Sequence, residues 1–423
     1  MTESYDPPQR EYRTKGYFLF LFIFLCLMEI FDTYTTQYPN VIVSKVQEQF
    51  LSHLDPITAD SQMALVVALA SVGMLFVVIN QVLADFFGRR IFLFITMFGM
   101  GIASLCIFFS QTLVQYGIFL FFLYVFFSSD IWTIYITEEC RKERRGLNLN
   151  LILVFGVIGA LLVPTFRGIF LPTDTSMNWQ GMTYFAFAAI PLSFAVIGIK
   201  ETRKFQELKS TRVQKPTPKE NFSKFIKPFS QKYRKSFIPI LVMSFLQGLN
   251  YTFIQLGEAF ISDHLSGEQI NWVVTAMGLA AIVGYLLTGL LSDKFGRKPM
   301  LVIYSILLPS SIALSVFGAT SDFAFIALLI GASLASLTYW SLGVVNRLVS
   351  IEILPTDIRG TGTAIRSVIT AIGTILGGFL NSWLIAKVTL GPSFFIVSLV
   401  LLVNVPLILF LIKETKSIEL EIT

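Results

Sequence analysis

Twelve apolar segments of membrane-spanning length limit what this chain can fold into. A helix needs about 20 apolar residues to cross the hydrocarbon core of a bilayer. Hydropathy predicts spans at about 17–38, 61–84, 91–110, 114–137, 147–171, 180–199, 237–262, 270–292, 299–318, 322–349, 362–386 and 392–412. Of the 423 residues, 54% are hydrophobic and only 14% are charged, whereas about a quarter of the residues in soluble domains are charged. The sequence therefore predicts an all-α, multi-pass membrane protein.

The distribution of Lys and Arg predicts the orientation of these spans. If both termini are cytoplasmic, 27 of the 32 basic residues lie on the cytoplasmic side, and only Lys45 and Lys387 lie in outer loops. Cytoplasmic loops carry an excess of Lys and Arg. We therefore expect a plasma-membrane protein with both termini in the cytoplasm. The net charge of +5 then reflects topology, and we expect the lipid bilayer rather than nucleic acid as its surroundings.

One long polar stretch divides the chain into two sets of six spans. It is rich in Lys and contains three prolines, which is typical of a solvated linker. The predicted organisation is a cytoplasmic tail at 1–16, a six-helix bundle at 17–199, a basic cytoplasmic linker at 200–236, a second six-helix bundle at 237–412 and a tail at 413–423.

Three groups of charged residues and glycines recur in both halves at offsets of 208, 214 and 213 residues. They follow the second, fourth and sixth spans and, again, the eighth, tenth and twelfth. The members are Asp85, Gly88, Arg89, Arg90, Glu138, Arg145 and Glu201 in the first half and Asp293, Gly296, Arg297, Lys298, Glu352, Arg359 and Glu414 in the second. Collinear repeats of this kind predict two pseudo-symmetric bundles.

The repeated loop resembles the signature of the major facilitator superfamily. The second copy reads Gly289-Leu-Leu-Ser-Asp293-Lys294-Phe-Gly296-Arg297-Lys298. The run Glu352-Ile-Leu-Pro355-Thr356-Asp-Ile-Arg359-Gly360 resembles the sugar-porter and organic-ion (metabolite:proton symporter) branches. The resemblance implies twelve transmembrane helices in two bundles that rock around a central site. It also implies secondary active transport of a small organic solute, with proton-coupled symport as the expected mechanism.

We interpret the repeated residues other than Glu201 and Glu414, together with Arg366, as a cytoplasmic gate. A carboxylate such as Asp85 or Asp293 can face the positive N-terminus of a helix in the other bundle. The Glu138/Arg145 and Glu352/Arg359 pairs can add charge-assisted hydrogen bonds. The alternative is that these residues anchor loops and fix topology, and Arg366 could instead meet an anionic substrate.

Two carboxylates lie one helical turn apart near the middle of the first span. An ionised group at mid-bilayer costs at least a few kcal/mol, so burial and mutual repulsion favour protonation of Glu29 or Asp32. Tyr34 and Gln37 follow on the outer side. We interpret this group as a substrate- and proton-binding site. The alternatives are neutralisation of an Arg within a span, a packed polar network, or direct binding of a cationic substrate.

Further polar and aromatic side chains within spans extend this candidate site. They are Asp130, Asn250, Gln255, Glu258, Tyr339 and Trp340. Packing or hydrogen bonding between helices is the alternative for each. Arg167 lies near the outer face and is expected to extend its charge toward water. Gly373, Gly377 and Gly378 predict close approach of helices.

Several other functions receive less support. Two His and three Cys without metal-binding spacing predict no metal site, and the absence of a phosphate-binding loop predicts no cofactor and no enzymatic activity. A facilitative carrier or exporter of organic cations or sugars is the alternative within the same fold. A transporter-like receptor that binds solute without moving it is the alternative of another class. We expect a monomer.

Overall fold

The computed structural model describes residues 14–126, 131–140, 145–173, 175–202, 205–206, 226–354 and 356–415. Every regular element within these ranges is helical, which confirms the all-α prediction. The N-terminal half contains α1 (Lys15–Gln37), η1 (Tyr38–Val41), α2 (Val43–Leu51), α3 (Pro56–Ser71), η2 (Val72–Leu75), α4 (Phe76–Phe87), α5 (Arg89–Phe108), α6 (Leu113–Val125), α7 (Ile131–Glu139), α8 (Arg145–Phe170), η4 (Trp179–Met182), α9 (Thr183–Phe187), α10 (Ala189–Ser193) and η5 (Phe194–Gly198).

The C-terminal half has a similar succession of helices. Its elements are η6 (Lys227–Phe229), α13 (Arg234–Leu249), α14 (Tyr251–Ser262), α15 (Gly267–Phe295), α16 (Arg297–Gly318), α17 (Ala324–Glu352), α18 (Thr356–Val388), α19 (Leu390–Ser398), η7 (Leu399–Val403) and α20 (Asn404–Leu411). Among the described residues, eleven helical segments are long and apolar enough to cross a membrane. The predicted span at 114–137 corresponds to α6 and α7, and Asp130 lies between them, outside the described residues.

Local sequence explains where several helices begin and end. The Asp55 side chain accepts a hydrogen bond from the Thr58 amide, and Pro56 follows it at the first position of α3. Gly88 separates α4 from α5 with φ +112°, and Gly296 separates α15 from α16 with φ +102°. Left-handed backbone favours glycine, so each of these glycines turns the chain between two consecutive spans.

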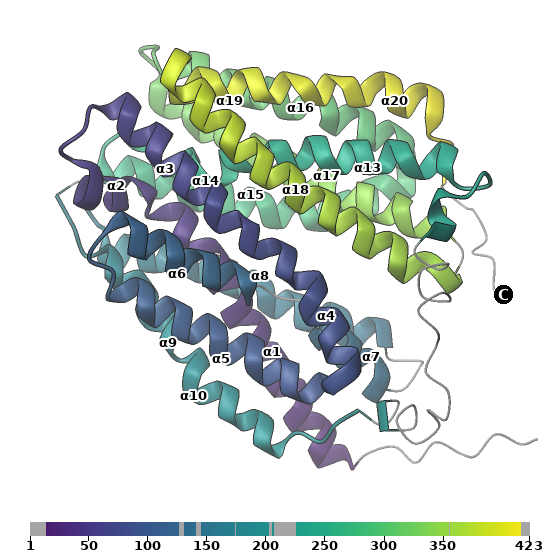
Figure 1. The fold of residues 1–423 in the computed structure, drawn as a ribbon. Coiled ribbons are helices and arrows are strands. Elements are labelled where there is room, and N and C mark those ends of the chain that lie inside the picture. Colours follow the sequence, from purple (N-terminus) through teal and green to yellow (C-terminus); the bar gives the residue numbers. More distant parts are fainter. Residues whose placement is uncertain are drawn as a thin grey trace, which may run out of the picture.

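The helices form two groups that meet along a seam. Figure 1 shows α16, α19 and α20 at the top and α1, α5, α9 and α10 at the bottom, with α18 lying along α3 between them. The predicted close approach of helices at the glycines of α18 is confirmed. Gly373 and Gly377 face the backbone of α13, and a Cβ added to Gly378 would lie 2.6 Å from the Cβ of Ala68 in α3.

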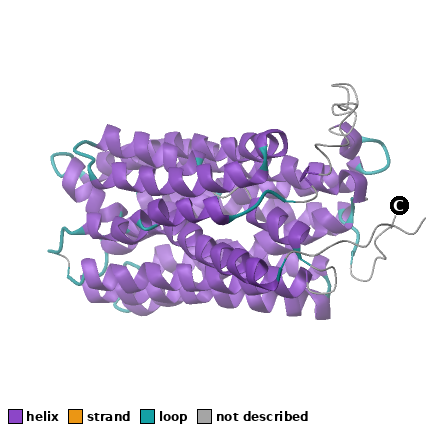
Figure 2. Cartoon of the chain, turned by 90° about the horizontal axis from the view of Figure 1, so that it is seen from below, coloured by secondary structure: helices purple, strands orange, loops and turns teal. Residues whose placement is uncertain are grey.

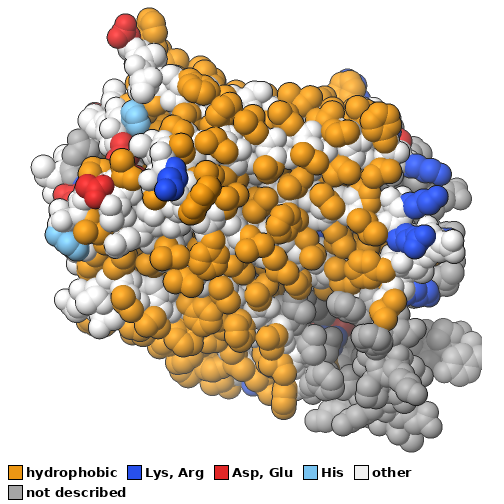
Figure 3. Space-filling view, turned by 45° about the horizontal axis from the view of Figure 1, so that its top comes forward, with side chains coloured by type: hydrophobic (Ala, Val, Ile, Leu, Met, Phe, Trp, Pro, Cys, Tyr) orange, Lys and Arg blue, Asp and Glu red, His pale blue; other side chains and the backbone are white. Residues whose placement is uncertain are grey.

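The two ends of the molecule differ in charge. We call the end where α1 begins and α20 ends the terminal end, and the end that carries α2 the distal end. The helices run side by side between loops at both ends (Figure 2). A broad band of hydrophobic side chains lies between the ends, and Lys and Arg gather at the terminal end (Figure 3). Large apolar side chains on this band are widely exposed, for example Leu290 (70%) and Phe410 (83%). Such exposure suits a surface that contacts lipid.

Candidate functional site

At the terminal end of the N-terminal half, a carboxylate covers the start of a helix. The backbone N–H groups of Arg89 and Arg90 donate to the two oxygens of Glu201 (N···O 3.2 Å each). These amides begin α5 and carry its positive dipole end. The Arg89 guanidinium also pairs with Glu138 of α7 at 3.2 Å, and both side chains are less than 10% exposed.

The C-terminal half repeats this arrangement. The N–H groups of Arg297 and Lys298 donate to Glu414 at 2.8 and 3.1 Å. The Arg297 guanidinium pairs with Glu352 of α17 at 3.0 Å. The Thr415 hydroxyl donates to Glu352 at 2.5 Å. The repeat in sequence is thus a repeat in contacts, and it includes Glu201 and Glu414, which the sequence interpretation left out of the gate although they shared its constant offset.

These contacts lie within each half rather than between the halves. Asp293, expected to face a helix of the other bundle, pairs with Arg297 four residues along at 2.8 Å, and its side chain is 71% exposed. The interbundle contact predicted for Asp293 is therefore absent from this conformation and stays a prediction for another one. The side chains of Asp85, Arg145 and Arg359 lie outside the described part of the structure.

The two acidic residues of α1 lie in the interior. Glu29 and Asp32 are each 8% exposed. Gly156 of α8 leaves space for Glu29, because a Cβ there would lie 2.9 Å from Glu29 Oε1. Tyr34 is fully buried, and its hydroxyl donates to the Met182 carbonyl at 2.6 Å, so its position favours the packing alternative.

A cluster of aromatic rings lies within the C-terminal half. The Trp340 ring centroid lies 5.3 Å from that of Tyr339, 5.8 Å from that of Tyr285 and 6.3 Å from that of Tyr251. The charges of Arg347 and Glu29 act on the Tyr285 hydroxyl, which puts this phenol in electrostatic range of both halves. Of the cluster, the sequence interpretation included Tyr339 and Trp340 and missed Tyr251 and Tyr285.

The remaining polar candidates make local or interhelical hydrogen bonds. The Asn250 side chain donates to Leu246 O of the preceding turn at 2.9 Å. Gln37 accepts from the Asn40 amide at 3.4 Å. Gln255 of α14 donates to the Ser71 hydroxyl of α3 at 3.1 Å, so Gln255 joins the two halves.

The distal end holds a buried ion pair between the halves. Arg167 of α8 and Glu258 of α14 pair at 2.6 Å, and each side chain is 2% exposed. The expectation that Arg167 extends toward water is wrong, because its guanidinium has buried partners: it also donates to the Val41 carbonyl at 2.8 Å and to Asn271 of α15. Glu258, predicted as a substrate- or proton-binding residue, lies in this network. Charged residues this deeply buried are normally paired.

Hydroxyl groups also join the halves near the distal end. Ser61 of α3 donates its hydroxyl to Ser382 O at 2.9 Å, and Ser382 of α18 donates its hydroxyl to Ser61 O at 2.8 Å. With the ion pair at the distal end and the Gln255–Ser71 contact nearer the middle of the spans, these bonds join the two halves. Among the gate residues whose side chains the structure describes, the Arg89–Glu138, Arg297–Glu352 and Arg297–Asp293 pairs each lie within one half.

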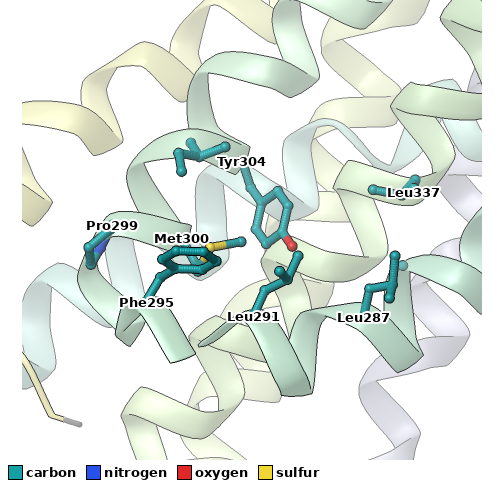
Figure 4. Close-up of a pocket in the computed structure, with 9 residues that line it drawn as sticks. Leu287, Leu291, Phe295, Pro299, Met300, Tyr304 and Leu337 are labelled. Atoms are coloured by element: carbon teal, nitrogen blue, oxygen red, sulfur yellow. The ribbon is translucent and has the colours of Figure 1, made fainter. Parts of the chain in front are cut away.

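One cavity of about 540 Å³ has none of the predicted site residues in its lining. Side chains of α15, α16 and α17 line it, among them Leu287, Leu291 and Met300 (Figure 4). The phenol of Tyr304 also reaches the cavity, and its hydroxyl is bonded to Thr288 at 3.0 Å. An apolar lining of this kind offers little to orient a polar solute, so we do not assign the solute site to it.

Comparison with known proteins identifies several relatives. The sequence profile described as Major Facilitator Superfamily matches residues 14–263 and 240–421. A protein of Bacillus subtilis (strain 168), provisionally named the niacin/nicotinamide transporter NiaP, is 26% identical over 345 residues, covering 80% of this chain and 83% of the relative. A D-xylose-proton symporter superimposes with a TM-score of 0.77 at 18% identity, covering 95% of this chain and 99% of the other. The inward-open xylose transporter XylE from E. coli gives 0.73 at 17% identity, covering 96% and 98%.

Proposed function

Because the chain belongs to the Major Facilitator Superfamily, we propose that this membrane transporter moves a small organic solute by alternating access, in symport with protons. Two bundles that rock about a central site expose that site to one side of the membrane at a time. The proton gradient would supply the driving force, since each charge that crosses the field is worth about 2.3 kcal/mol per 100 mV.

One observation carries the proposal: a buried ion pair joins the two halves at the distal end, while the two described Arg–Glu pairs at the terminal end each lie within one half. The Arg167–Glu258 pair joins the halves at 2.6 Å, whereas Arg89–Glu138 and Arg297–Glu352 each stay within one half. This asymmetry is expected of a carrier whose central site is closed at one end.

The terminal end is proposed to face the cytoplasm and the distal end the outside. The gathering of Lys and Arg at the terminal end (Figure 3) supports this orientation. We propose the plasma membrane as the location of the protein. We further propose that the chain acts as a monomer, because each bundle already provides one side of the central site.

The central site is proposed to bind an aromatic carboxylate. The rings of Tyr251, Tyr285 and Trp340 offer stacking surfaces, and Arg347 supplies a positive charge that acts on the Tyr285 hydroxyl. The Bacillus subtilis relative is named for niacin and nicotinamide, which are an aromatic carboxylate and its amide. Glu29 and Asp32, both buried in α1 of the N-terminal half, are the proposed proton carriers.

Uptake into proteoliposomes under an imposed pH gradient tests this function. Nicotinate, nicotinamide, benzoate, xylose and a quaternary amine are offered, with protein-free vesicles as control. We expect accumulation of an aromatic carboxylate that collapses when a protonophore removes the gradient. Downhill uptake that ignores the gradient would identify a facilitative carrier, uptake of the amine would identify a cation carrier, and binding without uptake would identify a receptor.

A further inference from the structure

A carboxylate of the C-terminal half lies among hydrogen-bond donors that belong wholly to the N-terminal half. The Glu258 carboxylate accepts from the Ser44 backbone N–H at 2.8 Å and from the Ser44 hydroxyl at 2.6 Å. It also accepts from the Arg167 guanidinium at 2.6 Å. We call these three donors the carboxylate cradle. They contact both oxygens of the Glu258 carboxylate, which is how a carboxylate ligand is held.

The orientation of Arg167 is fixed within its own half. Its Nε donates to the Val41 carbonyl at 2.8 Å, and both residues belong to the N-terminal half. The other two guanidinium nitrogens point across the seam, one to Asn271 and one to Glu258. When the halves separate, the Val41 bond can persist while the planar edge of the guanidinium becomes available. That edge matches the geometry of a carboxylate.

Separation of the halves, which rests on the proposed alternating access, removes Glu258 and Asn271 from the cradle. The Arg167 charge then lacks its buried partner, and an unpaired charge in a partly closed site is costly. A carboxylate from solution can restore the same contacts. A neutral amide offers one carbonyl acceptor but no charge, so the cradle distinguishes an acid from its amide.

We propose that the carboxylate cradle is an anion-binding site for the carboxylate group of a solute entering from the distal end. Glu258 occupies the cradle as an internal substitute while that end is closed. Solute binding and closure of the distal end therefore compete for Arg167 and Ser44. The solute must leave the cradle for the central site before the distal end closes.

The test measures the charge of the cradle directly. A reporter Val41→Cys, which keeps the backbone carbonyl that orients Arg167, is placed in a chain whose native Cys26, Cys106 and Cys140 are replaced by Ala. Glu258→Gln is added to empty the cradle of its carboxylate. Membrane-impermeant methanethiosulfonate reagents of equal length, one with a sulfonate and one with a trimethylammonium group, are applied from the distal side. Each reaction rate is divided by the rate of the same reagent with free cysteine, and the two normalised rates are compared.

We expect the anionic reagent to react at least tenfold faster than the cationic one when Arg167 is present. Arg167→Met should bring the ratio near one, and Arg167→Lys should keep part of it. Lys387→Met removes a basic side chain elsewhere at the distal end and should leave the ratio unchanged. Benzoate should protect the reporter, while benzamide should not.

Three results would overturn the proposal: a ratio near one with Arg167 present, a ratio unaffected by Arg167→Met, or equal protection by benzoate and benzamide. Absence of labelling in Glu258→Gln protein that elutes as a single species would also contradict it, because the cradle would then stay closed without its internal carboxylate. Failure of the proposed transport would show only in the uptake assay, so the two failures are distinguishable.

Discussion

Glu201 and Glu414 make the same contact in the two halves of the molecule: each accepts hydrogen bonds from the first two amides of the helix that follows a glycine turn. Glu201 contacts the start of α5, and Glu414 contacts the start of α16. Each carboxylate ends the last span of its own half, so it ties that span to the turn between the second and third spans of the same half. This tie lets each half move as a unit.

Loss of the charge of Glu201 or Glu414 should lower the stability of the half to which that residue belongs. Glu201→Gln keeps the shape but removes the charge that interacts with the α5 dipole, and we expect a loss of about 1 kcal/mol of stability. Glu414→Gln should cost less, because Glu414 is exposed. Thermal unfolding in detergent measures both. Glu48→Gln removes a carboxylate that is 50% exposed and pairs with Lys45 rather than with the start of a helix; it is the matched control and should cost less than Glu201→Gln.

The glycine turns should not tolerate a side chain. Gly88→Ala and Gly296→Ala force a Cβ onto left-handed backbone and into contact with the Glu201 and Glu414 carboxylates. We expect each to lower stability by about 1–2 kcal/mol. Gly278 is helical, and no neighbouring atom lies within 4 Å of an added Cβ, so Gly278→Ala should be neutral or stabilising. Equal melting temperatures for all three variants would contradict the proposed role of the turns.

Asp293→Asn should shift the conformational balance toward the state with an open terminal end. The carboxylate now pairs with Arg297 at the start of the next helix of the same half and is largely exposed, so it is available to a helix of the other half when the terminal end closes. Cysteine reporters placed at both ends should show higher reactivity at the terminal end and lower reactivity at the distal end. Unchanged reactivity at both ends would remove Asp293 from the gate.

The pair Glu29→Gln and Asp32→Asn should uncouple transport from protons. Both side chains are buried in α1, and each amide keeps the shape without a titrating group. We expect gradient-driven accumulation to fall at least tenfold while solute exchange across the vesicle membrane continues. Accumulation that still follows the pH gradient in the double variant would exclude these residues as proton carriers.

The aromatic cluster should contribute to solute affinity. Trp340→Ala removes the ring that contacts Tyr251, Tyr285 and Tyr339, and aromatic pairs are worth about 0.5–1.5 kcal/mol beyond the area they bury. We expect roughly tenfold weaker binding of an aromatic carboxylate in a scintillation-proximity assay. Trp272, which is 60% exposed, provides the matched control, since Trp272→Ala should leave affinity unchanged.

Hydropathy predicted most of the fold for a physical reason. The backbone N–H and C=O groups of each span must form hydrogen bonds within the span, and its side chains must tolerate lipid. The turns at Gly88 and Gly296 could also be predicted, because both glycines lie in the repeated sequence pattern. The glycines of α18 correctly predicted close packing between helices, because a glycine has no side chain to keep a neighbouring helix at a distance. These features depend on local sequence, and the structure confirms them.

The partners of charged residues were harder to predict. Arg167 near a span end has the same local pattern as a side chain that reaches water, and only the packing of α8 against α14 and α15 shows that Glu258 and Asn271 meet it. Tyr34 followed two acidic residues and was grouped with them, yet its hydroxyl bonds to a backbone carbonyl. Sequence spacing places residues on a helix face but does not reveal which helix lies opposite.

Two distances measured on one protein test alternating access most directly. Spin labels at Ser52 and Lys387 report on the distal end, and labels at the repeat-related Phe87 and Phe295 report on the terminal end. All four positions are exposed. Pulsed electron paramagnetic resonance is recorded in proteoliposomes with and without a transported solute. We predict that one distance lengthens as the other shortens; distances that change together, or a solute that changes neither, would contradict the account.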